Sequence, residues 1–191
     1  GSIANILVAN NMISNIRHSG SSTSTNAGAV GISLESTYGY MRFYNNSVLL
    51  DGTTGGNAAT FSACFYATSG SNNIDVRDNI FVNKYNSAAS TTDKGYAFYT
   101  TSSNTIFNEL NYNNYYVSTN NVTAYTSADR VGLAAFQTAY GRNANSREVD
   151  ASFVSSTNLR LTSTFGNTAF ASGTPIAEVP IDIDGTSRSH T

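Results

Sequence analysis

The sequence predicts an all-β fold in which short strands coil into about four stacked rungs. The first observation is a repeated corner motif that contains asparagine. Its four copies are spaced by 35, 33 and 35 residues, counted at Asn11, Asn46, Asn79 and Asn114. The second observation is that each repeat contains three strand-like runs and closes with a polar loop. Such a fixed period is typical of solenoids, in which each rung buries its apolar side chains against the next.

The first strand-like run places aromatic and aliphatic residues in register from rung to rung. It occurs three times, at residues 30–34, 63–67 and 96–100. Side chains alternate between the two faces of a strand, so one position should point into the coil and the next should point out. The expected inner column consists of Ile32, Phe65 and Phe98. The expected outer column consists of Ser33, Tyr66 and Tyr99.

The second run lies just before the corner and alternates in the same way. It occurs at residues 6–9, 41–44 and 74–77. Six apolar side chains are expected inside, namely Ile6, Val8, Met41, Phe43, Ile74 and Val76. Four side chains are expected outside, namely Arg42, Tyr44, Asp75 and Arg77. The fourth copy, residues 108–112, breaks this pattern after two extra residues, which predicts a β-bulge or a shift of register.

Asparagine at the corner has a structural explanation. Its side chain tolerates left-handed backbone and forms local hydrogen bonds with the main chain. Stacked amides can also bond from rung to rung, which satisfies buried polar groups that would otherwise cost about 1–3 kcal/mol each. The third run follows this corner, and its expected inner column is Ile13, Val48, Phe81 and Tyr116.

Composition narrows the class of protein. The chain has 10 Lys or Arg and 12 Asp or Glu residues, and its basic residues are scattered rather than clustered, which argues against a nucleic-acid partner. The single cysteine, Cys64, excludes an intrachain disulfide and is expected to be inert. The chain contains no run of 18 consecutive apolar residues, so no membrane-spanning helix is predicted. No signal-peptide pattern is visible, and Gly1-Ser2 is typical of a cloning remnant, so we expect an excerpt of a longer protein.

The pattern changes in the last third of the chain. We expect the rungs to occupy residues 1–126 and a capping region to occupy residues 127–191 within one structural unit. A helix is predicted over residues 128–140, started by Ser127 and ended by Gly141. Extended runs at 149–154 and 158–162 follow it. The closing run, residues 182–188, is expected to cap the coil, with Asp184 and Arg188 forming an ion pair.

These motifs resemble a known family. The corner motif Asn-Ile-Phe-Val-Asn at residues 79–83 resembles the typical rung of the right-handed parallel β-helix repeat proteins. The resemblance covers about residues 3–120. The ending also resembles that family, with "Leu-Arg-Leu-Thr" at 159–162 and "Asp-Ile-Asp-Gly-Thr-Ser-Arg" at 182–188. One departure is Phe136, where the family often has Trp. The resemblance implies a right-handed parallel β-helix with a C-terminal cap, secreted or at the cell surface of a bacterium.

The sequence offers no recognisable catalytic motif. The two histidines, His18 and His190, stand alone, so no nucleophilic triad or zinc site is predicted, and we expect no cofactor. The run from Asp182 to Asp184 has an alternative interpretation as a calcium site, but it lacks the longer ligand series of an EF-hand. Structural capping is the interpretation that we prefer.

Two groups of side chains are candidates for binding a glycan. The first is the outward tyrosines, because sugar rings bind to aromatic side chains flanked by polar groups. We place Tyr66 and Tyr99 on adjacent rungs of the first run, and Tyr44 and Tyr112 two rungs apart on the second. The second group could hold an acidic sugar and consists of Arg42, Asp75 and Arg77. The structural alternatives are simple sheet cover for the tyrosines and a solvated ion-pair group for the charges.

The function that we expect is that of a non-catalytic module of a larger secreted or cell-surface bacterial protein. It would bind a polysaccharide or cell-surface glycan, or serve as an adhesin or structural stalk. The alternative is the C-terminal part of a polysaccharide lyase or glycoside hydrolase that acts on acidic polysaccharide. Ice binding is a weaker third hypothesis, because no regular Thr-x-Thr ladder covers a flat face.

Overall fold

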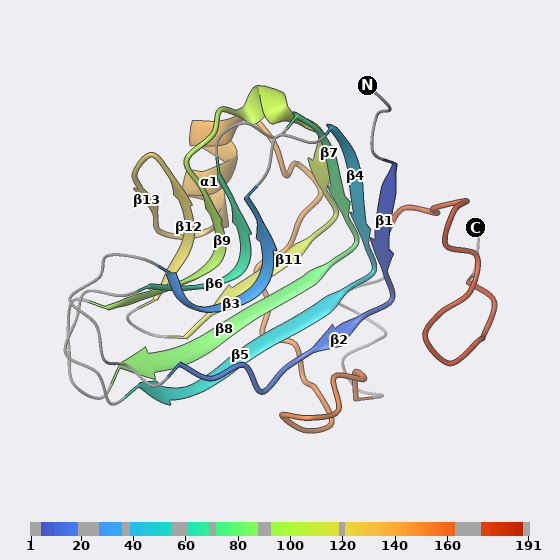
Figure 1. Cartoon of the computed structure of the whole chain (residues 1–191), viewed down its shortest axis with the longest axis horizontal. Coiled ribbons are helices and arrows are strands. Elements are labelled where there is room, and N and C mark those ends of the chain that lie inside the picture. The colour runs from blue at the N-terminus through green and yellow to red at the C-terminus, as the bar shows by residue number, and fades with distance from the viewer. Residues whose placement is uncertain are drawn as a thin grey trace.

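The computed structural model describes residues 5–18, 27–35, 39–54, 61–68, 72–87, 93–118, 121–162 and 173–188. Over these residues the fold is all-β apart from short helical segments, as predicted, with three sheets of mostly parallel strands that are consistent with a parallel β-solenoid (Figure 1). No helix among these residues has the length and apolar character needed to cross a membrane.

The chain visits the three sheets in the same order in each rung. Sheet A holds β1 (Ile6–Ala9), β4 (Gly39–Tyr44), β7 (Asn72–Arg77) and β10 (Phe107–Asn111). Sheet B holds β2 (Met12–Ile13), β5 (Ser47–Thr54), β8 (Ile80–Ser87) and β11 (Asn114–Val117). Sheet C holds β3 (Ala27–Leu34), β6 (Phe61–Ala67), β9 (Lys94–Thr100) and β12 (Val122–Thr126), and the short β13 (Asp129–Arg130) pairs antiparallel with β12.

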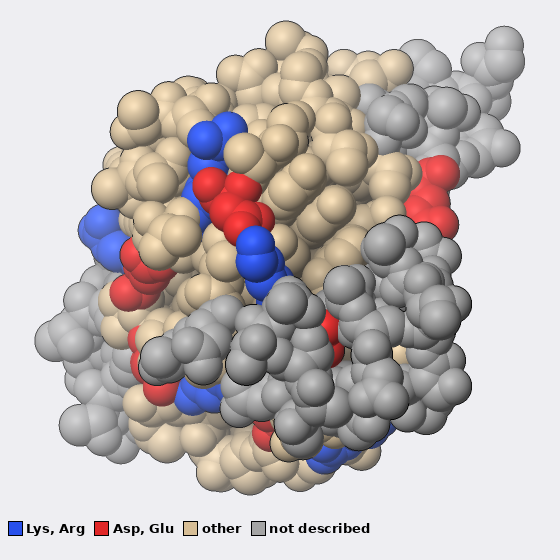
Figure 2. All heavy atoms as spheres, turned by 90° about the vertical axis from the view of Figure 1, so that its left-hand side faces the viewer, with Lys and Arg blue, Asp and Glu red and all other residues tan. Residues whose placement is uncertain are grey.

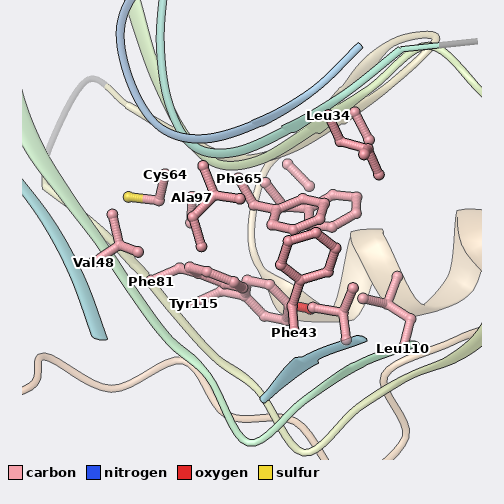
Figure 3. Packing of buried hydrophobic residues seen from close by; sticks show 14 of the residues in the cluster. Leu34, Phe43, Val48, Cys64, Phe65, Phe81, Ala97, Leu110 and Tyr115 are labelled. Atoms are coloured by element: carbon pink, nitrogen blue, oxygen red, sulfur yellow. The ribbon is translucent and has the colours of Figure 1, made fainter. Parts of the chain in front are cut away.

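The interior contains the columns that alternation predicted. Ile32 pairs with Phe65 and Phe65 with Phe98, and the two phenylalanine rings stack at 5.4 Å. Phe43 meets Phe65 edge-on from sheet A, with ring centroids 5.2 Å apart (Figure 3). Ile6 occupies the expected register opposite Met41, but it lies in the first rung and remains 43 % exposed.

The asparagine ladder is present, with one correction. Asn11, Asn46 and Asn79 stack as expected, but the fourth member is Asn113 rather than Asn114. The Oδ1 atom of Asn113 accepts hydrogen bonds from both the backbone and the side-chain amide of Asn79, each at 3.0 Å. The same shift places Tyr115 inside, opposite Phe81, so the prediction that Tyr116 points inward is wrong.

The irregular fourth rung confirms the predicted bulge. The register between β10 and β7 shifts between Phe107 and Glu109. Beyond the bulge, Asn111 rather than Tyr112 is in register with Arg77 and, one rung earlier, with Tyr44. Tyr112 instead occupies the left-handed corner position, with φ of 56°.

A short helix packs against the last rung. Helix α1 (Leu133–Tyr140) begins later than predicted, because residues 129–130 form β13 instead. Ser127 therefore does not cap it, and the amide of Leu133 donates to Glu148 at 2.9 Å. Gly141 ends the helix as predicted, with φ of 63° and its N–H bonded to the carbonyl of Gln137. Phe136 is fully buried, and its ring centroid lies 5.3 Å from that of Phe98.

After α1 the chain runs back along the outside of sheets B and A. We call residues 150–162 and 173–188 the tail. Its first part forms a small hairpin, with Phe153 opposite Leu161, that packs Leu159 onto Leu49 and Val82 of sheet B. In the second part, Ile176 and Val179 cover Tyr44 of sheet A. Figure 1 shows the tail in orange below β2 and β5, and in red beside β1.

The predicted ion pair between Asp184 and Arg188 is wrong. Asp184 pairs with Arg160 of the first hairpin and not with Arg188. Arg188 reaches the first rung instead, where its Nη2 atom donates to Oδ1 of Asn10 at 2.7 Å. The closing run is therefore fastened to the side of the coil at its first rung.

Candidate functional site

A column of aromatic rings occupies the outer face of sheet C. The strand register aligns Tyr66, Tyr99 and Tyr125 on three successive rungs. The ring centroids of Tyr66 and Tyr99 are 5.4 Å apart, and those of Tyr99 and Tyr125 are 4.5 Å apart and nearly parallel. The structure thus brings together the two tyrosines predicted for this face and adds Tyr125, because β12 continues the same alternation for one more rung.

Two further rings complete this aromatic column. Phe61, at the start of β6, stacks on Tyr99 at 4.2 Å. Tyr96 meets Tyr99 edge-on at 5.3 Å, and its hydroxyl donates to Asp129 at 2.9 Å. Lys94 forms an ion pair with the same carboxylate. We use the name aromatic column for Phe61, Tyr66, Tyr96, Tyr99 and Tyr125.

The rings are not equally available to a ligand. Tyr99 has Phe61 and Tyr125 stacked parallel to it, so its faces are occupied by its neighbours. Tyr66 is tilted by 27° from Tyr99, and on its other side the register continues with the small side chain of Ser33. The hydroxyl of Ser33 donates to Glu35 at 2.7 Å. Tyr66 therefore lies beside a hydroxyl and a carboxylate at the edge of the column.

Burial raises the pKa of two phenols of the column. Desolvation raises the pKa of Tyr66, and the negative charge of Glu35 raises it further. Desolvation also raises the pKa of Tyr99, with smaller effects from Tyr125, Tyr66 and Asp129. A neutral tyrosine hydroxyl can both donate and accept a hydrogen bond. Figure 2 views this side of the molecule, where Lys and Arg side chains lie next to Asp and Glu side chains on the described surface.

The tail contributes nothing to this aromatic packing. The hydrophobic cluster on the outer face of sheet C consists entirely of residues from β6, β9 and β12. The corresponding clusters outside sheets A and B each include residues of the tail, such as Val179 and Leu159. In the described part of the chain, the aromatic column is thus the outer apolar surface that the tail does not pack against.

The charged candidates on sheet A form a closed network. Arg77 makes two bonds of 2.7 Å to the carboxylate of Asp75, whose Oδ2 atom also accepts from the hydroxyl of Tyr44 at 2.6 Å. Burial and the bond to Asp75 raise the pKa of Tyr44, while the bond to Asp75 raises the pKa of Arg77. Tyr44 does point away from the core, as expected, but it is only 1 % exposed.

The remaining predicted residues are separated from one another. Arg42 binds Glu178 of the tail at 3.1 Å and Asn5 at 2.6 Å. Tyr112 lies at the corner rather than in the outer column of sheet A, so it does not align with Tyr44. The predicted acidic-sugar group of Arg42, Asp75 and Arg77 is therefore held by protein partners beneath or beside the tail.

A cavity that the sequence did not suggest lies between the coil and the tail. It has a volume of about 250 Å³ and is half-open. One wall consists of corner residues from three successive rungs, Asn10, Asn45 and Asp78, all with left-handed backbone. The facing wall belongs to the tail and includes Arg160, Asp182, Asp184 and Arg188. We call it the corner cavity.

The carboxylates of the closing run are used to shape its turn. Oδ1 of Asp182 accepts hydrogen bonds from the amides of Asp184 and Thr186, at 2.9 and 2.8 Å. Among the residues that the structure describes, no group of three or more His, Cys, Asp or Glu side chains is placed to hold a metal ion. His190 lies outside the described residues, and the backbone amide of His18 donates to Tyr85 at 3.1 Å.

The sequence signal for the corner cavity was indirect. Asn10, Asn45 and Asp78 each precede a ladder asparagine, and Asn and Asp are the side chains that tolerate left-handed backbone best after glycine. Nothing in their spacing indicates that the tail returns to face them.

No protein-family model matches this chain, and no curated protein or solved structure shows significant similarity to it.

Proposed function

We propose that this chain is a non-catalytic module that binds a polysaccharide or cell-surface glycan along the outer face of sheet C. The observation that carries the proposal is the aromatic column, in which Tyr66, Tyr99 and Tyr125 align over three rungs. Sugars present an apolar face of C–H groups and a rim of hydroxyls, which suits aromatic rings beside polar groups. A column along the coil axis also suits an extended chain of sugars.

Tyr66 is the residue on which we expect a sugar ring to stack. It is partly exposed at the end of the column, where Ser33 is too small to cover the ring. Glu35 lies close enough to Tyr66 to raise its pKa and can accept hydrogen bonds from sugar hydroxyls. A sugar at Tyr99 would meet the ring edge instead, because Phe61 and Tyr125 stack on its faces.

The proposal is tested by screening the folded protein against an array of neutral and acidic plant, algal and bacterial polysaccharides. We expect a specific hit that is lost in Tyr66→Ala, in which the stacking ring is removed. Tyr40→Ala is the matched control, because Tyr40 is 40 % exposed and belongs to sheet A. Equal loss in both variants, or a hit that survives Tyr66→Ala, would contradict the proposed binding face.

Two other results of the screen would point elsewhere. A blank array with a folded protein would favour a structural stalk or an adhesin that binds a non-glycan partner. Release of unsaturated products that absorb in the ultraviolet, from an acidic polysaccharide, would favour the lyase alternative. Either result would replace the proposal.

We infer further that the coil is a right-handed parallel β-helix and that the protein acts outside the cell. Three parallel sheets visited in a constant order support the first inference, because crossovers between parallel strands are right-handed in nearly all proteins. A left-handed coil in a crystal structure would contradict this inference. A surface in which polar side chains are mainly hydroxyls and amides supports the second inference, and cell fractionation of the source organism would test it.

A further inference from the structure

We propose that the corner cavity binds a single neutral sugar ring, either a free monosaccharide or the terminal residue of a glycan. The site is distinct from the aromatic column, because its walls come from the corner between sheets A and B and from the tail. The proposal depends on three features: how the tail is held over the corner, which polar atoms the walls leave unpaired, and the size and chemistry of the cavity.

The tail is fastened to the corner on either side of the middle rung. In the first rung, Asn10 donates to the carbonyl of Ile181 at 2.8 Å and accepts from Arg188 at 2.7 Å. In the third rung, Asp78 accepts from the amide of Thr174 at 3.0 Å. Asn45 of the second rung lies between these two attachments and lines the cavity. The cavity is thus framed by hydrogen bonds rather than by loose packing.

Three residues that line the cavity each carry a buried side-chain atom without a hydrogen-bond partner in the described structure. They are Oδ1 of Asn45, Oδ2 of Asp78 and Nε of Arg188. A buried polar group without a partner costs about 1–3 kcal/mol, and native proteins keep few of them. The unpaired atoms have almost no accessible surface, and small rotations of these side chains would let a ligand with adjacent hydroxyl groups donate to the two acceptors and accept from the guanidinium.

The charges that line the cavity favour a neutral ligand. Arg160 is already paired with Asp184, and Asp182 is bonded to the turn that contains it. Asp78 is bonded to Thr174 and Arg188 to Asn10, and burial raises the pKa of Asp78 although the charge of Arg188 opposes the shift. A uronate would place another carboxylate among three aspartates, which raises the electrostatic cost of binding.

The remaining lining is apolar and small. Met12, Ile80, Leu159 and Leu161 contribute to it. These side chains offer contact for the C–H face of a sugar ring. Cavities that hold drug-sized ligands measure about 300–1,000 Å³, so a volume of about 250 Å³ suits one ring better than an oligosaccharide.

The test is saturation-transfer NMR on the whole chain with glucose, galactose, mannose, galacturonate and glucuronate. We expect transfer to at least one of the neutral hexoses and weaker transfer to the uronates. An oligosaccharide that ends in the bound hexose, compared with one that carries it internally, separates a terminal-residue site from a site for free sugar. Absence of transfer to all three neutral hexoses, or preference for a uronate, would overturn the proposal.

Two variants test the location without disturbing the attachments of the tail. Asn45→Gly removes the unpaired amide oxygen and keeps the left-handed backbone, where φ is 54°. Ser47→Ile fills the cavity from a position in register with Ile80, so the strand already accommodates this side chain one rung away. Both should weaken binding by about tenfold or more, or about 1.4 kcal/mol.

Matched controls show whether the effect is local. Tyr112→Gly changes the same corner position in the fourth rung, where φ is 56°, and does not touch the cavity. Tyr66→Ala alters the aromatic column alone. Both controls should bind the hexose like the unmodified protein. Binding that survives Ser47→Ile, or that falls with Tyr66→Ala, would place the sugar elsewhere and refute the proposed site.

Discussion

The Oδ1 atom of Asn79 accepts two hydrogen bonds from Asn46, one from its backbone amide at 3.0 Å and one from its side-chain amide at 2.9 Å. The same arrangement recurs between Asn11 and Asn46 and between Asn79 and Asn113. The amide nitrogen of each inner asparagine also donates to backbone carbonyls, as Asn79 does to Phe43 at 2.8 Å. The ladder thus satisfies backbone groups at a corner where no sheet is present.

Replacing Asn79 by alanine should be strongly destabilising. The change removes the acceptor of both amides of Asn46 and one donor each to Asn113 and Phe43, and a buried group left without a partner costs about 1–3 kcal/mol. We expect the free energy of unfolding to fall by about 3–5 kcal/mol, measured by urea denaturation. Asn11→Ala is the control, because Asn11 is exposed in the first rung and should lose about 1 kcal/mol. Equal losses would mean that the ladder is not the source of stability.

Truncating Phe136 should open the coil at its last rung. The ring of Phe136 is fully buried and packs within 5.5 Å of both Phe98 and Tyr115, measured between centroids. Phe136→Ala is expected to cost about 3–5 kcal/mol of unfolding free energy, because it leaves a cavity between the helix and the rung. Val131→Ala, at a side chain that is 75 % exposed, should change stability by less than about 0.5 kcal/mol. A small effect of Phe136→Ala would show that the helix does not close the core.

Asp78 should make stability depend on pH. Desolvation raises its pKa from 3.8 to about 6, although Thr174, Arg77 and Arg188 oppose the shift. The folded protein therefore holds this proton more tightly than the unfolded chain, so the contribution of Asp78 to stability declines as pH rises between these two values.

Asp78→Asn is the variant that checks this effect. Its Oδ1 atom can still accept from Thr174, but it carries no buried charge. Above pH 6 the melting temperature of the variant should be higher than that of the unmodified protein, and this difference should shrink as pH falls to 3.8. Calorimetry across this range measures the difference. A constant difference, or one that grows towards low pH, would show that the carboxyl group is not desolvated.

Cys64 should report global unfolding. Its side chain has no exposed surface, and burial raises the pKa of its thiol, so the reactive thiolate is absent from the folded state. We expect a chromogenic disulfide reagent to label Cys64 when urea is added, and the labelling rate should equal the rate of unfolding in urea. A second thiol at the exposed Val131 position should react at once in the folded protein. Rapid labelling of Cys64 without denaturant would reveal local opening of sheet C.

The rungs could be predicted because their signals are local and repeated. The alternation of Phe65-Tyr66 and Phe98-Tyr99 assigns inner and outer faces in adjacent rungs, and the structure confirms both assignments. The fourth rung was harder, because Asn113 and Asn114 are adjacent and identical. Only the backbone can distinguish them, since Tyr112 takes the left-handed position that precedes each ladder asparagine.

The path of the tail could not be predicted in the same way. Its contacts join positions far apart in sequence, such as Asp78 with Thr174 and Tyr44 with Val179, and they follow no period. Tyr44 and Arg42 lie on the outer face of sheet A as expected, but alternation cannot indicate what covers that face. The corner cavity depends on the same distant contacts and so was missed.

The hydrogen bond between Arg188 and Asn10 has a consequence for cooperativity. Solenoids usually behave as one-dimensional arrays, in which each repeat contacts its neighbours and terminal repeats can fray independently. Here the last described residue holds the first rung across a separation of 178 residues, and the tail between them touches the rungs in the middle. Through the tail, the first rung is connected to the middle and last rungs as well as to its neighbour. The two ends of the coil should therefore unfold together rather than one rung at a time.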